Sequence, residues 1–294
     1  MGLTNETSRF ECRFLRADQF RTVHKTFIGG FSDYIIKFEL TERQFQNHIT
    51  LNAVDLDRSA GCFEGKKPVG LSLNGFGKWE GKPTIYDAGT AVLPAYRRRG
   101  VSRSMFDWMV PMFAKEGFDQ FLLEVITSND PAIRLYEQLG FRRKRELLLL
   151  EADSLENCDN GDAISREIEI REIHRHENIP FESFWDGKPS WQNSIEAVQR
   201  SIQMKRVFGA FIGRDCVGYI VFSSGMGRLA QLAVHREHRR KGIGTRLLIE
   251  MQKDSTENNL QVINLDESMT ESVVFFQNRG FRKVLGQYEM MMEL

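Results

Sequence analysis

The sequence predicts a mixed α/β protein built from two related domains in tandem. The chain has 294 residues, which is enough for two domains that each bury a core. Short apolar runs of strand character alternate with stretches whose apolar residues recur at helical spacing. The pattern of the first half also returns in the second half, which indicates two copies of one fold.

Residues 122–141, LLEVITSNDPAIRLYEQLGF, form the most informative stretch of the first half. Residues 122–126 predict a strand that carries one carboxylate, Glu124. Residues 128–131, SNDP, then predict a helix start with Asn129 at its mouth, and the helix continues through Tyr136. We expect Glu124, Asn129 and Tyr136 to face one pocket, because a strand's end lies beside the first turns of the helix that follows it.

This arrangement allows two interpretations. A carboxylate and a phenol that face one substrate can act as a base and an acid. Alternatively, Glu124 lies on a solvated strand edge and Tyr136 is a packed ring of an amphipathic helix. The remaining motifs of the chain favour the chemical interpretation.

A basic loop lies upstream of this stretch. A strand that ends near Val92 leads into residues 97–102, RRRGVS, and a helical run follows at 103–114. A glycine turn that opens a helix presents free backbone N–H groups and the positive end of the helix dipole. Such a loop suits a pyrophosphate group.

Together, the loop and the later stretch resemble the GNAT superfamily of acyl-CoA-dependent N-acyltransferases over most of residues 9–150. The family loop reads R/Q-x-x-G-x-G/A, and its second block reads N-x-x-A-x-x-x-Y-x-x-x-G-F. Ser102 replaces the last small residue of the loop, which is a minor change in volume. The matching residues are Arg97 and Gly100 in the loop and Asn129, Ala132, Tyr136, Gly140 and Phe141 in the second block.

The resemblance implies a fold, a cofactor and roles. Each domain should be a mostly antiparallel sheet, splayed at an acyl-CoA slot and flanked by helices. Acetyl-CoA or another acyl-CoA would donate the acyl group to a small-molecule or peptide amine, with Glu124 as general base and Tyr136 as general acid for the CoA thiolate. The residues implied to bind the acyl-CoA are Thr90, Ala91, Val92, Arg97, Arg98, Arg99, Gly100, Val101, Ser102, Arg103 and Asn129.

Two helices are predicted ahead of these motifs. The first runs through Phe20 and Phe27 and is broken at residues 29–30, GG; the second spans residues 41–50, with Thr41 as its N-cap. In the family, these helices cover the acceptor side of the cleft. The candidates for contact with the acceptor are therefore Phe31, Asp33 and Tyr34, although simple packing would also explain them.

The second copy keeps the loop and loses the chemical groups. A hairpin pattern at residues 61–70 returns at 209–218, and Gly140-Phe141 returns as Gly280-Phe281. At the positions of Glu124, Asn129 and Tyr136 the second copy has Asn264, Met269 and Phe276, which cannot serve as base or acid. It would bind acyl-CoA idly, bind nothing, or act as scaffold. Its candidate acyl-CoA residues are Leu232, Ala233, Val234, Arg239, Arg240, Lys241, Gly242, Ile243, Gly244 and Thr245.

These repeats predict a catalytic domain at residues 9–150 and a degenerate domain at 168–294. The polar, acidic residues 151–167 predict the linker. Two rival functions remain open at this point. One is a non-catalytic acyl-CoA sensor or scaffold, and the other is a nucleic-acid-binding module built on the two short basic runs.

Composition argues against several partners. Lys and Arg total 40 and Asp and Glu total 40, so no net charge draws the chain to nucleic acid or membrane. The four cysteines lie far apart with no metal-ligand spacing, which predicts free thiols, no metal site and a cytoplasmic location. The identity of the amine acceptor and the oligomeric state stay open.

Overall fold

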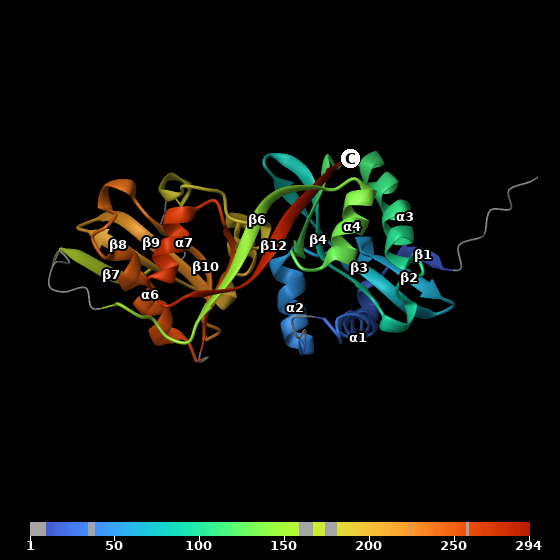
Figure 1. The fold of residues 1–294 in the computed structure, drawn as a ribbon, viewed down its shortest axis with the longest axis horizontal. Helices are drawn as coiled ribbons and strands as arrows, with labels where there is room; N and C mark the ends of the chain where they lie inside the picture. The colour runs from blue at the N-terminus through green and yellow to red at the C-terminus, as the bar shows by residue number, and fades with distance from the viewer. Residues whose placement is uncertain (1–9, 35–38, 159–166, 174–180, 224, 257–258) are drawn as a thin grey trace, which may run out of the picture. The chain divides into compact units, whose positions relative to one another are not determined.

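The computed structural model describes all residues except 1–9, 35–38, 159–166, 174–180, 224 and 257–258 (Figure 1). It separates into two compact units. The first unit comprises Met1–Val125, Asn129–Lys144 and Glu289–Leu294, and the second comprises Ile126–Ser128 and Arg145–Tyr288. Residues 159–166 of the expected linker lie outside the described part of the chain. The expected boundaries at 150 and 168 stay a prediction.

The first unit surrounds its sheet with four α-helices among the described residues. Its strands pair antiparallel from β1 to β4, and β4 pairs parallel with β5. The strands are β1 (Glu11–Phe14), β2 (Ala60–Glu64), β3 (Lys67–Trp79), β4 (Lys82–Val92) and β5 (Gln120–Ile126), and the helices are α1 (Phe20–Gly30), α2 (Glu42–Leu51), α3 (Val101–Lys115) and α4 (Asp130–Leu139).

The second unit repeats this order. Its strands pair antiparallel from β7 to β10, and β10 pairs parallel with β11. The strands are β7 (Ile168–Glu172), β8 (Lys205–Ile212), β9 (Asp215–Ser223), β10 (Arg228–Val234) and β11 (Leu260–Asp266), and the helices are α5 (Ile195–Arg200), α6 (Ile243–Asp254) and α7 (Thr270–Gln277). The predicted α/β fold, with a mostly antiparallel sheet in each copy, is therefore confirmed.

In both units the parallel pair separates part-way along. The register of β4 with β5 ends at Asp87↔Leu123, although β4 continues to Val92. The register of β10 with β11 ends at Leu229↔Val262, although β10 continues to Val234. Past these levels, among the described residues, β4 lacks a partner on the edge that faces β5, and β10 lacks one on the edge that faces β11. Backbone N–H and C=O groups on these edges can pair with an extended ligand.

The last strand of each sheet comes from a distant part of the chain. β6 (Arg142–Ala152) pairs antiparallel with β11 in the second unit, and its Leu148 and Leu150 join that unit's hydrophobic core. β12 (Arg282–Glu293) lies beside β5, and residues 289–294 belong to the first unit. The Leu294 N–H donates to the Asp119 carbonyl there. Each copy's closing strand thus serves the sheet of the other copy.

Most predicted elements are present with small shifts at their ends. The helix predicted through Phe20 and Phe27 is α1, which includes both residues of the glycine pair and is capped by Phe31. Thr41 caps α2 as predicted, through a capping box with Gln44.

The prediction of four free thiols is wrong for one pair. Cys12 and Cys62 face each other in the β1–β2 ladder and form a disulfide, whereas Cys158 and Cys216 keep their thiols. Sequence spacing could not reveal this pairing, because 50 residues separate the two cysteines and only the strand register brings them together.

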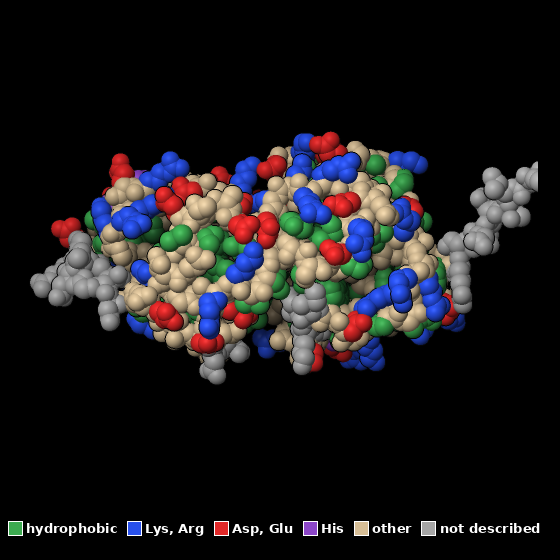
Figure 2. Space-filling view, in the orientation of Figure 1, with side chains coloured by type: hydrophobic (Ala, Val, Ile, Leu, Met, Phe, Trp, Pro, Cys, Tyr) green, Lys and Arg blue, Asp and Glu red, His purple; other side chains and the backbone are tan. Residues whose placement is uncertain are grey.

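The surface shown in Figure 2 carries Lys and Arg side chains interspersed with Asp and Glu side chains. Among the helices of the described residues, none has the length and apolarity to cross a membrane.

The capping box predicts a local stability effect. Thr41→Ala removes the side chain that accepts from the Gln44 N–H, so the start of α2 should lose about 1 kcal/mol. Hydrogen exchange of the α2 amides should then be about fivefold faster. Thr41→Ser keeps the hydroxyl and should exchange like the parent; equal rates in the alanine variant would contradict the capping role.

Candidate functional site

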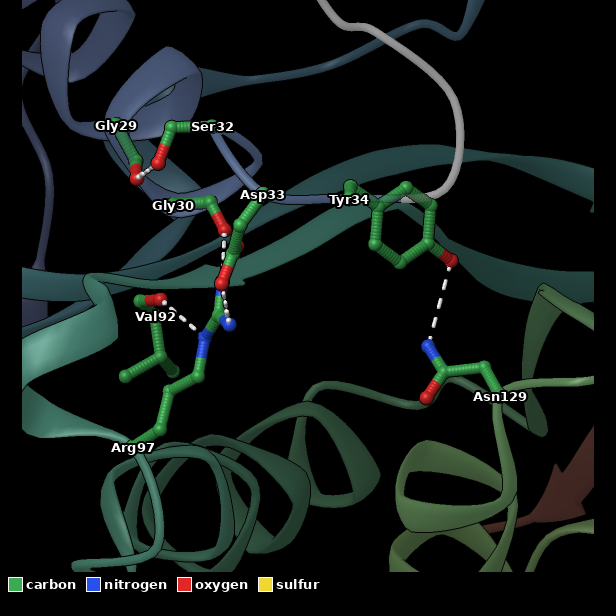
Figure 3. A network of polar contacts seen from close by, with 8 residues as sticks. All are labelled: Gly29, Gly30, Ser32, Asp33, Tyr34, Val92, Arg97 and Asn129. Atoms are coloured by element: carbon green, nitrogen blue, oxygen red, sulfur yellow. Dashed lines mark hydrogen bonds and ion pairs between the residues drawn. The ribbon is translucent and has the colours of Figure 1, made fainter.

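Asn129 occupies the mouth of α4, as predicted. Its Oδ1 accepts from the Ala132 N–H at 3.3 Å, which caps the helix. Its Nδ2 donates to the Tyr34 hydroxyl at 3.4 Å (Figure 3). Burial raises the pKa of Tyr34, and the hydrogen bond from Asn129 partly opposes this. The structure thus brings together a predicted acceptor residue and a predicted cofactor residue.

Glu124 lies on β5 and is half-buried. The Tyr86 hydroxyl, on the neighbouring strand β4, donates to Glu124 Oε2 at 2.7 Å. Tyr86 is fully buried, so its ring fixes the hydroxyl in place. The carboxylate is therefore held by a partner that the sequence pattern did not identify.

Tyr136 is both a packed ring and a polar group. Its ring contacts Phe106 and Phe141 edge-on, with centroids 5.9 Å and 5.6 Å away. Its hydroxyl points to Asp87 Oδ2 at 3.5 Å. Burial, reinforced by the charge of Asp87, raises the pKa of Tyr136 well above its usual value. The phenol therefore keeps its proton at neutral pH.

Asp87 is the main group that sequence reasoning missed. It is 7% exposed, and it accepts from the Thr90 hydroxyl at 2.7 Å and from the Gly89 N–H at 2.9 Å. Burial raises its pKa to about 6, although these hydrogen bonds oppose the shift. The available signal was a single carboxylate in the strand, two residues ahead of Gly89.

The carboxylate and the phenol approach the slot from opposite faces of the sheet. Tyr86 is level with Leu122 and Asp87 with Leu123 in the β4–β5 register. Side chains alternate along a strand, so Glu124 lies on the face of Tyr86 and Tyr136 approaches Asp87 on the other face. β4 and β5 separate just past this level.

The first loop presents helix amides without a side-chain cap. Gly100 precedes α3 with φ of 81°, and no side chain caps the helix. A Cβ added at Gly100 would meet nothing within 4 Å, so the loop leaves open space there. The first-turn N–H groups of α3 are therefore available for an anion.

Arg97 holds this loop in place rather than pointing outward. Its Nε donates to the Val92 carbonyl at 3.2 Å, and its Nη2 donates to the Gly30 carbonyl at 2.9 Å (Figure 3). Its Nη1 donates to Asp33 at 2.7 Å, and this pairing lowers the pKa of Asp33. The arginine thus links the end of β4, the end of α1 and the loop.

The second copy repeats this clamp. Arg239 Nε donates to the Val234 carbonyl at 2.9 Å and Nη2 donates to the Phe184 carbonyl at 3.2 Å. Nη1 forms an ion pair with Asp186 at 2.7 Å. The loop of the second copy is therefore built like the first, with Gly242 at φ of 75° before an uncapped α6.

The second unit contains a cavity of about 610 Å³ along its loop and strands. It extends from Trp185 and Tyr219, past Val234 and Asn264, to the loop at Gly242. Of the residues predicted to have replaced catalytic groups, Asn264 is 5% exposed and Phe276 packs against Phe281. The second copy therefore keeps an open slot without the acid and base candidates of the first.

A separate cluster lies just ahead of the second loop. His235, Glu237 and His238 each offer an atom within 4.8 Å of the others, a set that could hold a metal ion. The expectation that no metal takes part stays a prediction.

Comparison with known families matches both copies. The Acetyltransferase (GNAT) family model matches residues 26–141, and the Acetyltransferase (GNAT) domain model matches residues 185–291. Together the two models cover most of the chain.

Individual proteins that are similar to this chain are acetyltransferases by name. The chain is similar to the [ribosomal protein bS18]-alanine N-acetyltransferase of Escherichia coli K12, with 28% identity over 43% of this chain and 68% of that protein. A GCN5-related N-acetyltransferase from Sphaerobacter thermophilus superposes with a TM-score of 0.70 at 12% identity, covering 98% of this chain and 97% of that chain.

A tandem GNAT protein from the clavulanic acid biosynthesis pathway also has a TM-score of 0.70, at 15% identity, over 96% of this chain and 98% of that one. These two structures support the fold alone. With both copies matched by family models, the chain belongs to the GNAT superfamily and is an acetyltransferase with two GNAT domains in tandem.

Proposed function

We propose that the first unit transfers an acetyl group from acetyl-CoA to a primary amine by direct attack, with Glu124 as general base and Tyr136 as general acid. The observation that carries the proposal is the position of these groups on opposite faces of the sheet, next to the level where β4 and β5 separate. A base and an acid are needed on opposite sides of the acyl carbon, where the amine enters and the thiolate leaves.

The residues around the slot fit an acyl-CoA. The end of β4 from Gly89 to Val92 is not paired with β5, so its edge on that side offers main-chain groups to a pantetheine arm. The uncapped start of α3 offers N–H groups to a pyrophosphate. Asn129, at the start of α4, lies beside the same opening. When bound, acetyl-CoA would supply the acyl group as a reactive thioester.

Each catalytic role follows from the local surroundings. Glu124 would accept a proton from the amine nitrogen, directly or through a water, while Tyr86 orients its carboxylate. Tyr136 keeps its phenol proton at neutral pH and would donate it to the sulfur as the carbon–sulfur bond breaks. Asp87 and Thr90 would hold the phenol in position.

The acceptor is proposed to be a primary amine that enters beside α1 and α2. Phe31 and Tyr34 remain candidates for contact with it, whereas Asp33 is already paired with Arg97. One similar protein is named as an alanine N-acetyltransferase of ribosomal protein bS18, which makes an amine of a protein or peptide one candidate. A cytoplasmic location stays a prediction.

The second unit is proposed to bind acyl-CoA at its own loop without turnover. Among its described residues, the second unit lacks a counterpart of Asp87. Beside Val262, where β10 would carry it, the residues are the apolar Leu229 and Ala230. Asp266 remains a carboxylate, but hydrogen bonds from Ser268 and Arg145 overcome burial and lower its pKa, which makes it a poor base.

The alternative is that neither unit turns over and the protein is an acyl-CoA sensor. Thioester cleavage by the purified protein with a panel of amines, read as free thiol, distinguishes the two.

The role of Tyr136 predicts a specific kinetic effect. Tyr136→Phe keeps the packed ring and removes the proton donor, so kcat should fall about 10²- to 10⁴-fold with little change in acetyl-CoA affinity. Phe141→Leu, a change in the same aromatic cluster, is the packing control. Turnover within twofold of the parent in Tyr136→Phe would place the proton donor elsewhere.

The buried Asp87 predicts a pH dependence of stability. Between its usual pKa of 3.8 and about 6, Asp87 is protonated in the folded state and ionised in the unfolded chain. The free energy of unfolding should therefore fall as pH rises from 4 to 6, by up to about 3 kcal/mol. In urea unfolding, Asp87→Asn should remove this pH dependence of the free energy of unfolding. The control Asp107→Asn, at an exposed carboxylate, should retain it. An unchanged profile in Asp87→Asn would contradict the pKa assignment.

The two units predict opposite responses to a matched pair of variants. Glu124→Gln combined with Tyr136→Phe should abolish most acyl transfer, because both candidate groups are lost. Gly242→Asp adds bulk and negative charge at the second loop only, and it should leave transfer nearly intact. The reverse result would place catalysis in the second unit.

A further inference from the structure

The side chain that replaces the proposed base in the second unit is poised to donate a hydrogen bond. Asn264 is 5% exposed and lines the 610 Å³ cavity. Its Oδ1 accepts from Gln287 Nε2 at 2.8 Å, which fixes the orientation of the amide. Its Nδ2 is buried and has no hydrogen-bond partner. Leaving such a donor buried and unpaired is unfavourable, so its position needs an explanation.

The backbone holds Asn264 in this position. Its φ is 59°, in the left-handed region, and the β11–β6 register shifts between Val262 and Leu265. Asparagine tolerates this conformation better than most residues do, because its short amide is accommodated there. This irregularity places Asn264 two residues past Val262, the last residue of β11 that pairs with β10.

Three other polar side chains that line the cavity, those of Trp185, Tyr219 and Gln231, already have partners. Trp185 Nε1 donates to the Tyr219 hydroxyl at 2.6 Å, and that hydroxyl donates to Gln231 Oε1 at 3.1 Å. Gln231 Nε2 donates in turn to the Asn193 carbonyl at 2.6 Å. Among the described residues that line the cavity, the only buried side-chain atoms without a partner are Asn264 Nδ2 and, near the loop, His238 Nδ1.

We infer that the second unit is a receptor for an intact acyl-CoA thioester and that Asn264 Nδ2 donates to the thioester carbonyl oxygen. This inference rests on the proposed cofactor slot of the second unit. A neutral amide cannot take a proton from an amine, so the same substitution that removes the base supplies a donor that recognises the acyl group. The unit would then distinguish acyl-CoA from free CoA and would retain the thioester unchanged.

Calorimetry on the full chain tests this inference. Gly100→Asp is used as the background to weaken the first slot, and Gly100→Asp with Gly242→Asp serves as the blank. In the background variant, acetyl-CoA should bind about tenfold more tightly than CoA, a preference worth about 1.4 kcal/mol. Acetyl-CoA recovered after the titration should be intact by mass spectrometry.

The matched variant is Asn264→Asp, which keeps the size and the oxygen facing Gln287 but removes the free N–H donor. It should bind CoA within about threefold of the background while losing the preference for acetyl-CoA. Equal affinity for the two ligands in the background, or an unchanged preference in Asn264→Asp, would overturn the inference alone. Absence of CoA binding in the folded background variant would instead overturn the proposed second slot, and the inference with it.

Discussion

The function of each copy depends on one parallel strand pair that is joined at one end and open at the other. The ladder holds β4 to β5 only as far as Asp87 and β10 to β11 only as far as Leu229. An arginine, Arg97 or Arg239, then fixes the free end of the strand by donating to its last carbonyl and pairing with an aspartate. The other edge of each strand end stays paired, to β3 as far as Val92 and to β9 as far as Val234. The arginine adds a second anchor that ties the strand end to the loop after it.

The same backbone arrangement carries different side chains at the corresponding positions of the two copies. In the first, Glu124 and Asp87 place carboxylates on the two faces next to the opening, and Tyr136 brings a phenol with a raised pKa. In the second, an amide and apolar side chains occupy these levels, yet the cavity and the loop remain. Loop geometry and catalytic groups are therefore separable, because the loop is built from backbone and a clamp that does not touch the reacting atoms.

Much of this arrangement could be predicted from the sequence, for physical reasons. Helical spacing located α1, α2 and α4, and the glycine turns located both loops, because these depend on neighbouring residues. Asp87 and the Cys12–Cys62 bond were missed because each depends on strand register. Asp87 meets Tyr136, which lies 49 residues later in the chain, and the cysteines meet only in the β1–β2 ladder. The Arg97–Asp33 pair was also out of reach, since 64 residues separate its members.

The placement of β6 and β12 bears on how the chain is made. The sheet of the first unit includes residues 289–294, so a ribosome that has finished residue 150 has not yet produced all of that unit. Until then, the free edge of β5 is a strand edge open to wrong partners. Conversely, β6 emerges more than a hundred residues before β11, the strand with which it pairs. Completion of the first sheet therefore waits for synthesis of the second copy, and a chain truncated between the two copies would leave β5 without β12.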